Sequence, residues 1–173
     1  IQTSITLEDG SVGISSIPSG LSVGKYEALE LRDNDPSRFA GLGVLKAVAS
    51  VNEKIAPRIL NLEAQEQRNI DHLMVNLDGT ENKANLGANS ILSVSQALCK
   101  AATSSAHVPL FRYLNSFGQT FSLPASIEKM PTPCFNILNG GKHGGGNLDF
   151  QEFMVIPPTA KNYHQGLELG VNI

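Results

Sequence analysis

Apolar and polar residues alternate over residues 1–17, which is the period of a half-exposed β-strand. The alternation is interrupted once, by Glu-Asp-Gly-Ser at 8–11, a run with the composition of a tight turn. It resumes at Val12 and Ile14 on the far side of that turn. The pattern predicts a β-hairpin, followed by a loop with two glycines at 18–24.

Three stretches with apolar residues at helical spacing follow the hairpin. The first runs over 44–55 and is expected to end before Pro57, because proline lacks the N–H that a helix interior needs. The second runs over 70–77 and is closed by an Asp-Gly-Thr turn. The third, 88–106, is rich in Ala and Ser, and small residues let neighbouring elements approach closely. We therefore expect this helix to be central, with a short helix after it from Pro109.

The composition changes at 115–133, where Ser, Gly, Gln, Thr and three prolines are typical of an interdomain connection. Beyond it the pattern predicts a strand at 134–138, a glycine-rich loop at 139–147 and a second strand at 151–156. Pro-Pro ends that strand, and Thr159 is expected to cap a final helix.

The charge balance narrows the class of protein. The 173 residues carry 13 Lys and Arg against 16 Asp and Glu, a net charge of −3, which gives no electrostatic case for nucleic-acid binding. No apolar run approaches the roughly 18 residues that span a membrane. Cys99 and Cys134 are too few for a disulfide framework. Neither Ile1 nor Ile173 has the capping expected of a natural terminus, so we expect a piece of a longer protein.

Two glycine-containing segments are candidates for ligand binding. The run at 20–25 superficially matches a phosphate-binding P-loop, but it has three residues between its glycines and Tyr26 after the lysine, so that interpretation fails. Five glycines between 140 and 146 flank Lys142 and His143. Either they let a ligand approach the backbone closely, or the loop is a solvated tip; the residues alone leave both open.

Side chains that could bind a ligand or transfer a proton lie where the two predicted strands of the second part meet. If those strands pair antiparallel, Gln151 and Glu152 begin the second strand where the loop of His143 leaves the first. A Gln-Glu pair ahead of an apolar strand indicates use of the pair, while a solvated strand-end carboxylate is the simpler alternative. The sequence has neither a CxxC nor an HExxH motif, and the other three histidines are interpreted as structural or surface residues: His72, His107 and His164.

Three long segments resemble the enolase family in order and spacing along nearly the whole chain. They are 17–33, 77–89 and 138–154, the last containing Leu-Asn-Gly-Gly-Lys-His and Gln-Glu-Phe-Met. The resemblance implies an α+β capping domain of small antiparallel sheet and helices over 1–117, with its first strand missing. It implies a linker and the first two strands of an incomplete enolase-type β/α barrel over 118–173, a part expected to pack poorly alone.

Enolases interconvert 2-phosphoglycerate and phosphoenolpyruvate with Mg²⁺, a reversible dehydration of glycolysis, so the resemblance implies a magnesium-dependent carbon–oxygen lyase. Ser22 would contribute an oxygen to magnesium from a loop that closes over substrate. His143 would reach the phosphate and leaving-group side of the substrate, and Gln151 would contact the substrate. Glu152 would be part of the hydrogen-bond network on the side of the catalytic acid. Catalysis is thus assigned to His143 and Glu152, and substrate binding to these two and Gln151.

The resemblance places the lysine base, the acid glutamate and the three acidic magnesium ligands beyond Ile173, so we expect the 173-residue chain alone to be inactive. It also implies a cytoplasmic homodimer acting on a small molecule; the expectation of no nucleic-acid partner and no membrane span rests on the charge balance and the apolar runs described above. Leu21 and Val23 replace the usual Ala and Thr beside Ser22, which supports an alternative, a non-catalytic homologue with a binding or structural role. Ser90 and Ser93 replace Ala and Gly, and their hydroxyls need hydrogen-bond partners.

Overall fold

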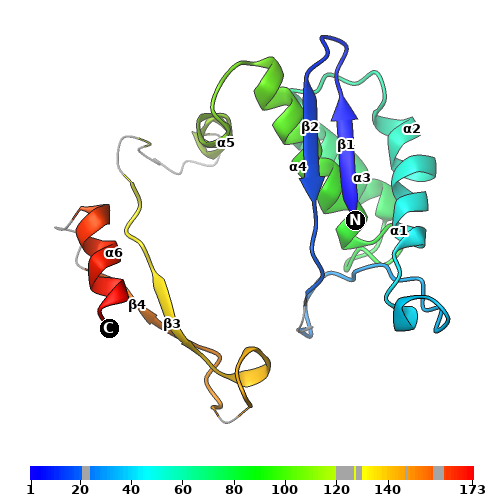
Figure 1. Cartoon of the computed structure of the whole chain (residues 1–173). Helices are drawn as coiled ribbons and strands as arrows, with labels where there is room; N and C mark the ends of the chain where they lie inside the picture. The colour runs from blue at the N-terminus through cyan, green and yellow to red at the C-terminus, as the bar shows by residue number, and fades with distance from the viewer. Residues whose placement is uncertain (21–23, 120–126, 128–129, 147, 158–161) are drawn as a thin grey trace. The chain divides into compact units, whose positions relative to one another are not determined.

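The computed structural model describes residues 1–20, 24–119, 127, 130–146, 148–157 and 162–173. The chain divides into two compact units, residues 1–114 and 115–173, which are described separately (Figure 1). The domain boundary expected between residues 117 and 118 stays a prediction.

The first unit begins with the predicted hairpin. Strands β1 (Gln2–Thr6) and β2 (Val12–Ser16) pair antiparallel, from Gln2 opposite Ser16 to Thr6 opposite Val12. The turn is closed by a hydrogen bond of 2.8 Å from the Leu7 N–H to the Ser11 carbonyl. The inner face of β2 carries Gly13 and Ser15, whereas Val12 and Ile14 are exposed. The larger apolar residues of this strand therefore do not form its core face.

The first predicted helix is longer than expected. It comprises α1 (Leu45–Ala49), the π-helical turn η2 (Ser50–Ile55) and α2 (Ala56–Ile59), so the expectation that it ends before Pro57 is wrong. The π-helical turn interrupts the α-helical hydrogen bonding, and Pro57 then falls in the first turn of α2. A missing N–H costs nothing at that position, which is why the proline is tolerated.

The remaining helices of this unit follow the predicted order. A single 3-10 turn, η1 (Phe39–Gly41), precedes α1, and α3 (Gln67–Asp78) ends at Gly79 in a left-handed cap. Helix α4 (Ala88–Ser105) matches the Ala- and Ser-rich stretch. Helix α5 (Leu110–Gln119) begins in this unit, extends past its last residue, Leu114, and is longer than the short helix expected there. None of the helices in the described part of the chain is both long and apolar enough to cross a membrane.

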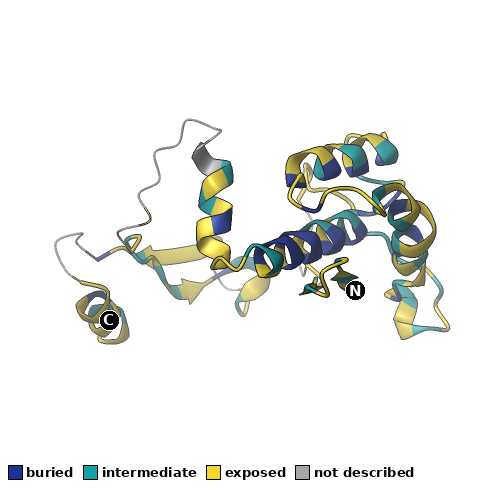
Figure 2. Ribbon diagram, turned by 90° about the horizontal axis from the view of Figure 1, so that it is seen from above, coloured by how far each residue is buried: buried dark blue, intermediate teal, exposed yellow. Residues whose placement is uncertain are grey.

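Helix α4 is central, as its small residues predicted. Ala97, Ala101 and Val94 are buried along it, and most of the helix is coloured as buried in Figure 2. The β2 backbone lies directly against it: a Cβ placed on Gly13 would be 2.0 Å from the Ala97 carbonyl oxygen and 2.3 Å from the Ala101 nitrogen. Only glycine fits at position 13, and this close approach fixes the hairpin on the helix.

The hydroxyls of Ser90 and Ser93 have the partners that their burial requires. Ser90 donates to the Ala47 carbonyl of α1 at 3.0 Å, and Ser93 donates to the Ser90 carbonyl one turn back at 2.9 Å. Since Ser93 has only one hydroxyl proton, its contact of 2.8 Å with Thr3 Oγ1 makes Thr3 the donor. These bonds connect α4 to α1 and to β1 and give each of these three hydroxyls a partner.

The buried carboxylate of Asp78 organises the turn between α3 and α4. It accepts the N–H groups of Leu86 at 2.7 Å and Asn85 at 3.1 Å, together with the N–H and hydroxyl of Thr80. Burial alone would raise the pKa of Asp78, but these hydrogen bonds outweigh it and the net pKa is lowered. The carboxylate therefore stays ionised and fixes the loop that leads into α4.

The second unit contains the predicted pair of strands. β3 (Phe135–Asn139) and β4 (Glu152–Val155) pair antiparallel with an irregularity between Asn136 and Leu138, and the 3-10 turn η3 (Gly141–His143) lies in the loop between them. Helix α6 (Tyr163–Val171) is capped by Asn162, whose side chain accepts the Gln165 N–H at 2.9 Å. The cap is therefore not Thr159, which lies outside the described residues.

Apolar side chains of this hairpin remain uncovered. Leu138, Met154 and Ile156 are each more than half exposed, at 56, 52 and 64%. In the described part of this unit they have no apolar layer of the kind that a sheet face needs for burial. The exposure accords with a hairpin that requires further elements to cover it.

We expect Gly13→Ala to destabilise the first unit by about 1–3 kcal/mol or more, because the new methyl group would overlap the α4 backbone. Chemical denaturation followed by circular dichroism measures this loss. Gly24→Ala is the matched control, since its Cβ meets nothing closer than the Glu27 side chain at 3.6 Å. Equal stability of Gly13→Ala and the parent chain would contradict the packing.

The lowered pKa of Asp78 predicts an acid-sensitive contribution to stability. Because the folded pKa lies below the unfolded one, the contribution is complete above about pH 4 and is lost as the pH falls through the folded value. Asp78→Asn should cost about 2–3 kcal/mol at neutral pH. The difference in unfolding free energy between parent and variant should shrink as acid is added, and a difference independent of pH would refute this role.

Candidate functional site

The backbone of the β3–β4 hairpin brings the predicted site residues to its loop end. Asn139 is paired with Glu152 in the strand register, and the Gly140 N–H donates to the Gln151 carbonyl at 2.9 Å. The Gly141 N–H donates to the Leu148 carbonyl, also at 2.9 Å. Gln151 and Glu152 therefore start the second strand directly beside the point where the loop of His143 begins.

Close approach of the loop to itself explains part of the glycine run. A Cβ on Gly140 would lie 2.0 Å from the Phe150 carbonyl oxygen and 2.9 Å from the Leu148 Cβ. A side chain at position 140 would prevent the loop from folding back on the start of β4. At this position the glycine serves the fold, which the sequence alone could not separate from a role in binding a ligand.

The functional groups at this loop end are open to a ligand. Lys142, His143, Gln151 and Glu152 are all exposed. The Asn139 side chain is held in place by Asn136, whose Nδ2 donates to its Oδ1 at 2.6 Å. The site thus offers an imidazole, an ammonium, an amide and a carboxyl group on one tightly turned segment. Such a set can bind an oxyanion and can exchange a proton with it.

An aromatic pair that the sequence pattern did not single out supports the start of β4. The rings of Phe150 and Phe153 meet edge to face, with centroids 6.0 Å apart and an interplanar angle of 66°. Phe150 is still 75% exposed. In the sequence, the only indication of this contact is that the two aromatic residues flank Gln151 and Glu152. The contact between the rings constrains the backbone that carries Gln151 and Glu152.

The predicted metal ligand Ser22 and its neighbours Leu21 and Val23 lie outside the described residues. Within the described ranges, no group of three or more His, Cys, Asp and Glu side chains could hold a metal ion. The residues described here therefore do not by themselves fit a magnesium site. Both cysteines are free, and burial raises the pKa of the Cys99 thiol, which makes it a poor nucleophile or ligand.

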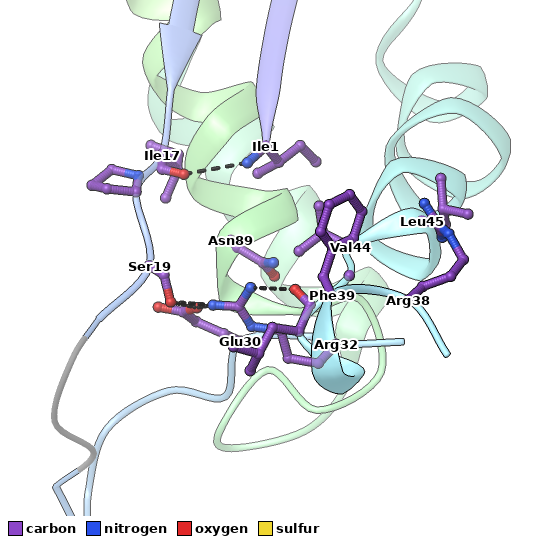
Figure 3. A pocket seen from close by; sticks show the side chains of 13 residues that line it. Ile1, Ile17, Ser19, Glu30, Arg32, Arg38, Phe39, Val44, Leu45 and Asn89 are labelled. Carbon is purple, nitrogen blue, oxygen red and sulfur yellow. Dashed lines mark hydrogen bonds and ion pairs between the residues drawn. The ribbon is translucent and has the colours of Figure 1, made fainter. Parts of the chain in front are cut away.

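Two cavities in the described part of the first unit are lined by its own residues. A cavity of about 870 Å³ runs along the free edge of β1 beside α2, and a smaller one of about 290 Å³ is lined by Ser19, Glu30 and Arg32 (Figure 3). Glu30 and Arg32 were not among the residues expected from the sequence to have a role. The only sequence signal for them is the pair of opposite charges two residues apart in the segment after Ser22.

Comparison with protein families gives two consecutive matches. The enolase N-terminal domain matches residues 1–114, and the enolase C-terminal TIM barrel domain matches residues 127–173. The chain belongs to the enolase family. The predicted resemblance is confirmed, and so is the fold class: an enolase N-terminal domain with small antiparallel sheet and helices, followed by the start of the barrel domain.

Family membership fixes the broad chemistry. Enolase domains are those of the enolase-superfamily lyases, which generally use Mg²⁺ and act on small molecules. The β3–β4 loop end of this chain lies wholly within the match to the enolase barrel domain. The residues expected to hold substrate therefore belong to the first strands of that barrel, where loops at strand ends carry active-site groups.

Proposed function

We propose that this chain is part of an enolase that interconverts 2-phosphoglycerate and phosphoenolpyruvate in glycolysis. Two family matches in the order capping domain and barrel domain support the reaction. The observation that carries the proposal is the loop end of the β3–β4 hairpin, where His143, Gln151 and Glu152 share one exposed segment. The substrate is proposed from the family resemblance, and these groups suit it, since a phosphorylated hydroxy acid presents two anions and a leaving hydroxyl.

The dehydration removes the proton on C2 and breaks the C3–O bond. Overall, a proton from C2 and a hydroxide from C3 are lost, which amounts to one molecule of water. A carbon acid beside a carboxylate is very weak, so the site must stabilise charge that develops in the transition state. His143 is proposed to contact the phosphate and leaving-group side, and Gln151 to contact substrate. Glu152 is proposed to be one of the hydrogen-bonded residues through which a proton reaches the departing hydroxyl.

The backbone geometry supports these roles. The hydrogen bond from Gly140 to the Gln151 carbonyl and the pairing of Asn139 with Glu152 fix where the two side chains leave the hairpin. Lys142, adjacent to His143, adds a cation beside the imidazole and favours an anionic ligand. A preorganised backbone lowers the cost of ordering these groups when substrate binds.

Magnesium dependence is proposed for the enzyme as a whole, with Ser22 contributing one oxygen. Magnesium prefers several oxygen ligands including carboxylates, and the described residues do not gather them. A homodimer and a cytoplasmic location are further parts of the proposal that come from the family resemblance.

Variants in the full enolase that contains this chain test the site. Glu152→Gln and His143→Ala should each lower kcat for phosphoenolpyruvate formation by about 100-fold or more, because the first removes a group proposed to help deliver a proton and the second a contact to the phosphate and leaving-group side. The rate is measured from the absorbance of the phosphoenolpyruvate that forms. Asp149→Ala is the matched control, an exposed carboxylate beside Gln151 to which no catalytic role is assigned, and it should keep activity.

The outcomes separate the proposal from its alternative. Full activity of folded Glu152→Gln and His143→Ala would refute the assigned roles, and an inactive full-length parent would favour the non-catalytic homologue. The 173-residue chain alone should form no phosphoenolpyruvate. Product formation by the purified chain would refute the expectation that its lysine base and metal carboxylates lie elsewhere.

A further inference from the structure

The carboxylate of Glu30 holds the chain immediately before the segment that carries Ser22. Its Oε1 accepts the Gly20 N–H at 2.8 Å, and its Oε2 accepts the Ser19 hydroxyl at 3.3 Å. Both contacts join residues ten or eleven positions apart in the sequence. A single side chain therefore fixes the backbone direction at Ser19–Gly20, two residues ahead of Ser22.

Arg32 holds this carboxylate in place. Its Nη2 lies 2.5 Å from Glu30 Oε2 and also contacts the Ser19 hydroxyl, while its Nη1 donates to the Leu42 carbonyl at 2.9 Å. Figure 3 shows Ser19, Glu30 and Arg32 converging on one wall of the 290 Å³ cavity. The guanidinium thus connects three separate segments of backbone, and the Glu30 side chain keeps few alternative rotamers.

The backbone on either side of Glu30 is anchored to the start of α4. The Leu29 carbonyl accepts the Ala88 N–H at 2.8 Å. The Asn89 side chain accepts the Leu31 N–H at 3.0 Å and donates to the Leu31 carbonyl at 3.2 Å. Asn89 is only 5% exposed, so these bonds are shielded from water. The position of Glu30 is consequently set by the central helix of the unit.

We propose that Glu30 is a positioning residue for the reaction. Its backbone is held by the start of α4, its carboxylate holds Ser19 and Gly20, and it thereby fixes the backbone position of the two residues that precede the Ser22 segment. The inference rests on the proposed function, in which Ser22 contributes an oxygen to the active site. Glu30 itself touches neither substrate nor the reacting atoms. Its effect is on the fraction of molecules in which this part of the backbone has the productive position.

Because the Glu30–Arg32 pair is partly exposed, its effect on the position of the backbone can be distinguished from an effect on global stability. The side chains of Arg32 and Glu30 are 21 and 31% exposed, and ion pairs of this kind add little to global stability. Substitution of Glu30 should therefore leave the unfolding midpoint of the chain nearly unchanged. It should act locally, on the Gly20 N–H that loses its acceptor.

Hydrogen exchange on the 173-residue chain tests the contact directly. In Glu30→Ala the Gly20 amide should exchange about tenfold faster or more, and Glu30→Gln, which keeps an acceptor oxygen, should recover part of the protection. Asp35→Ala is the matched control: Asp35 also accepts a backbone N–H and a hydroxyl, both from Ser37, at 2.9 and 2.6 Å. It should leave Gly20 unchanged. Unaltered exchange at Gly20 in Glu30→Ala would overturn the proposal.

Kinetics of the full enolase test the consequence. Glu30→Ala should lower kcat/KM about tenfold with the unfolding midpoint retained, Glu30→Gln should restore part of the loss, and Asp35→Ala should match the parent. Faster exchange at Gly20 with unchanged kcat/KM would overturn the positioning role while leaving the roles of His143 and Glu152 standing. An inactive parent enzyme would overturn both the proposed function and this inference, whereas the exchange experiment would still report on the contact.

Discussion

The contact between the β2 backbone and α4 is the constraint on which the first unit depends. A helix can lie this close to a strand only where neither side inserts a side chain, and Gly13 against Ala97 and Ala101 meets that condition. The same closeness explains why Val12 and Ile14 are exposed while Ser15 is buried. Ser15 donates to Gln96 Oε1 at 2.7 Å, so the short polar side chain has a partner in the space that remains.

From α4, hydrogen bonds extend the fixed geometry to Ser19 and Gly20, the residues just before the Ser22 segment. The Asp78 carboxylate orders the loop that leads into the helix, and within that loop the Asn82 carbonyl accepts the Leu29 N–H at 2.7 Å. Asn89 then holds Leu31, which leaves Glu30 between two anchored residues. Hydrogen-bonded polar side chains thus connect the core of the unit to Ser19–Gly20.

The second unit is organised in a different way. Its hairpin has few buried side chains, and its shape depends on backbone contacts such as that between Gly140 and Gln151. Exposed Leu138, Met154 and Ile156 show that packing contributes little here. The functional groups of His143 and Glu152 are therefore placed by the strand register and the glycine turn rather than by a surrounding core.

Sequence by itself determined the elements whose cause is local. Alternation and turn residues gave the first hairpin, small residues identified α4 as central, and the order of strand, glycine loop and strand placed Gln151 and Glu152 at the loop end beside His143. Tertiary structure decided what depends on contacts between distant segments. It buried Ser15 of β2 and left Val12 and Ile14 exposed, let the helix continue through Pro57, and gave Glu30 its link to Gly20. Periodicity records which face of an element is apolar, but only the distance between two backbones decides whether a large side chain can lie there.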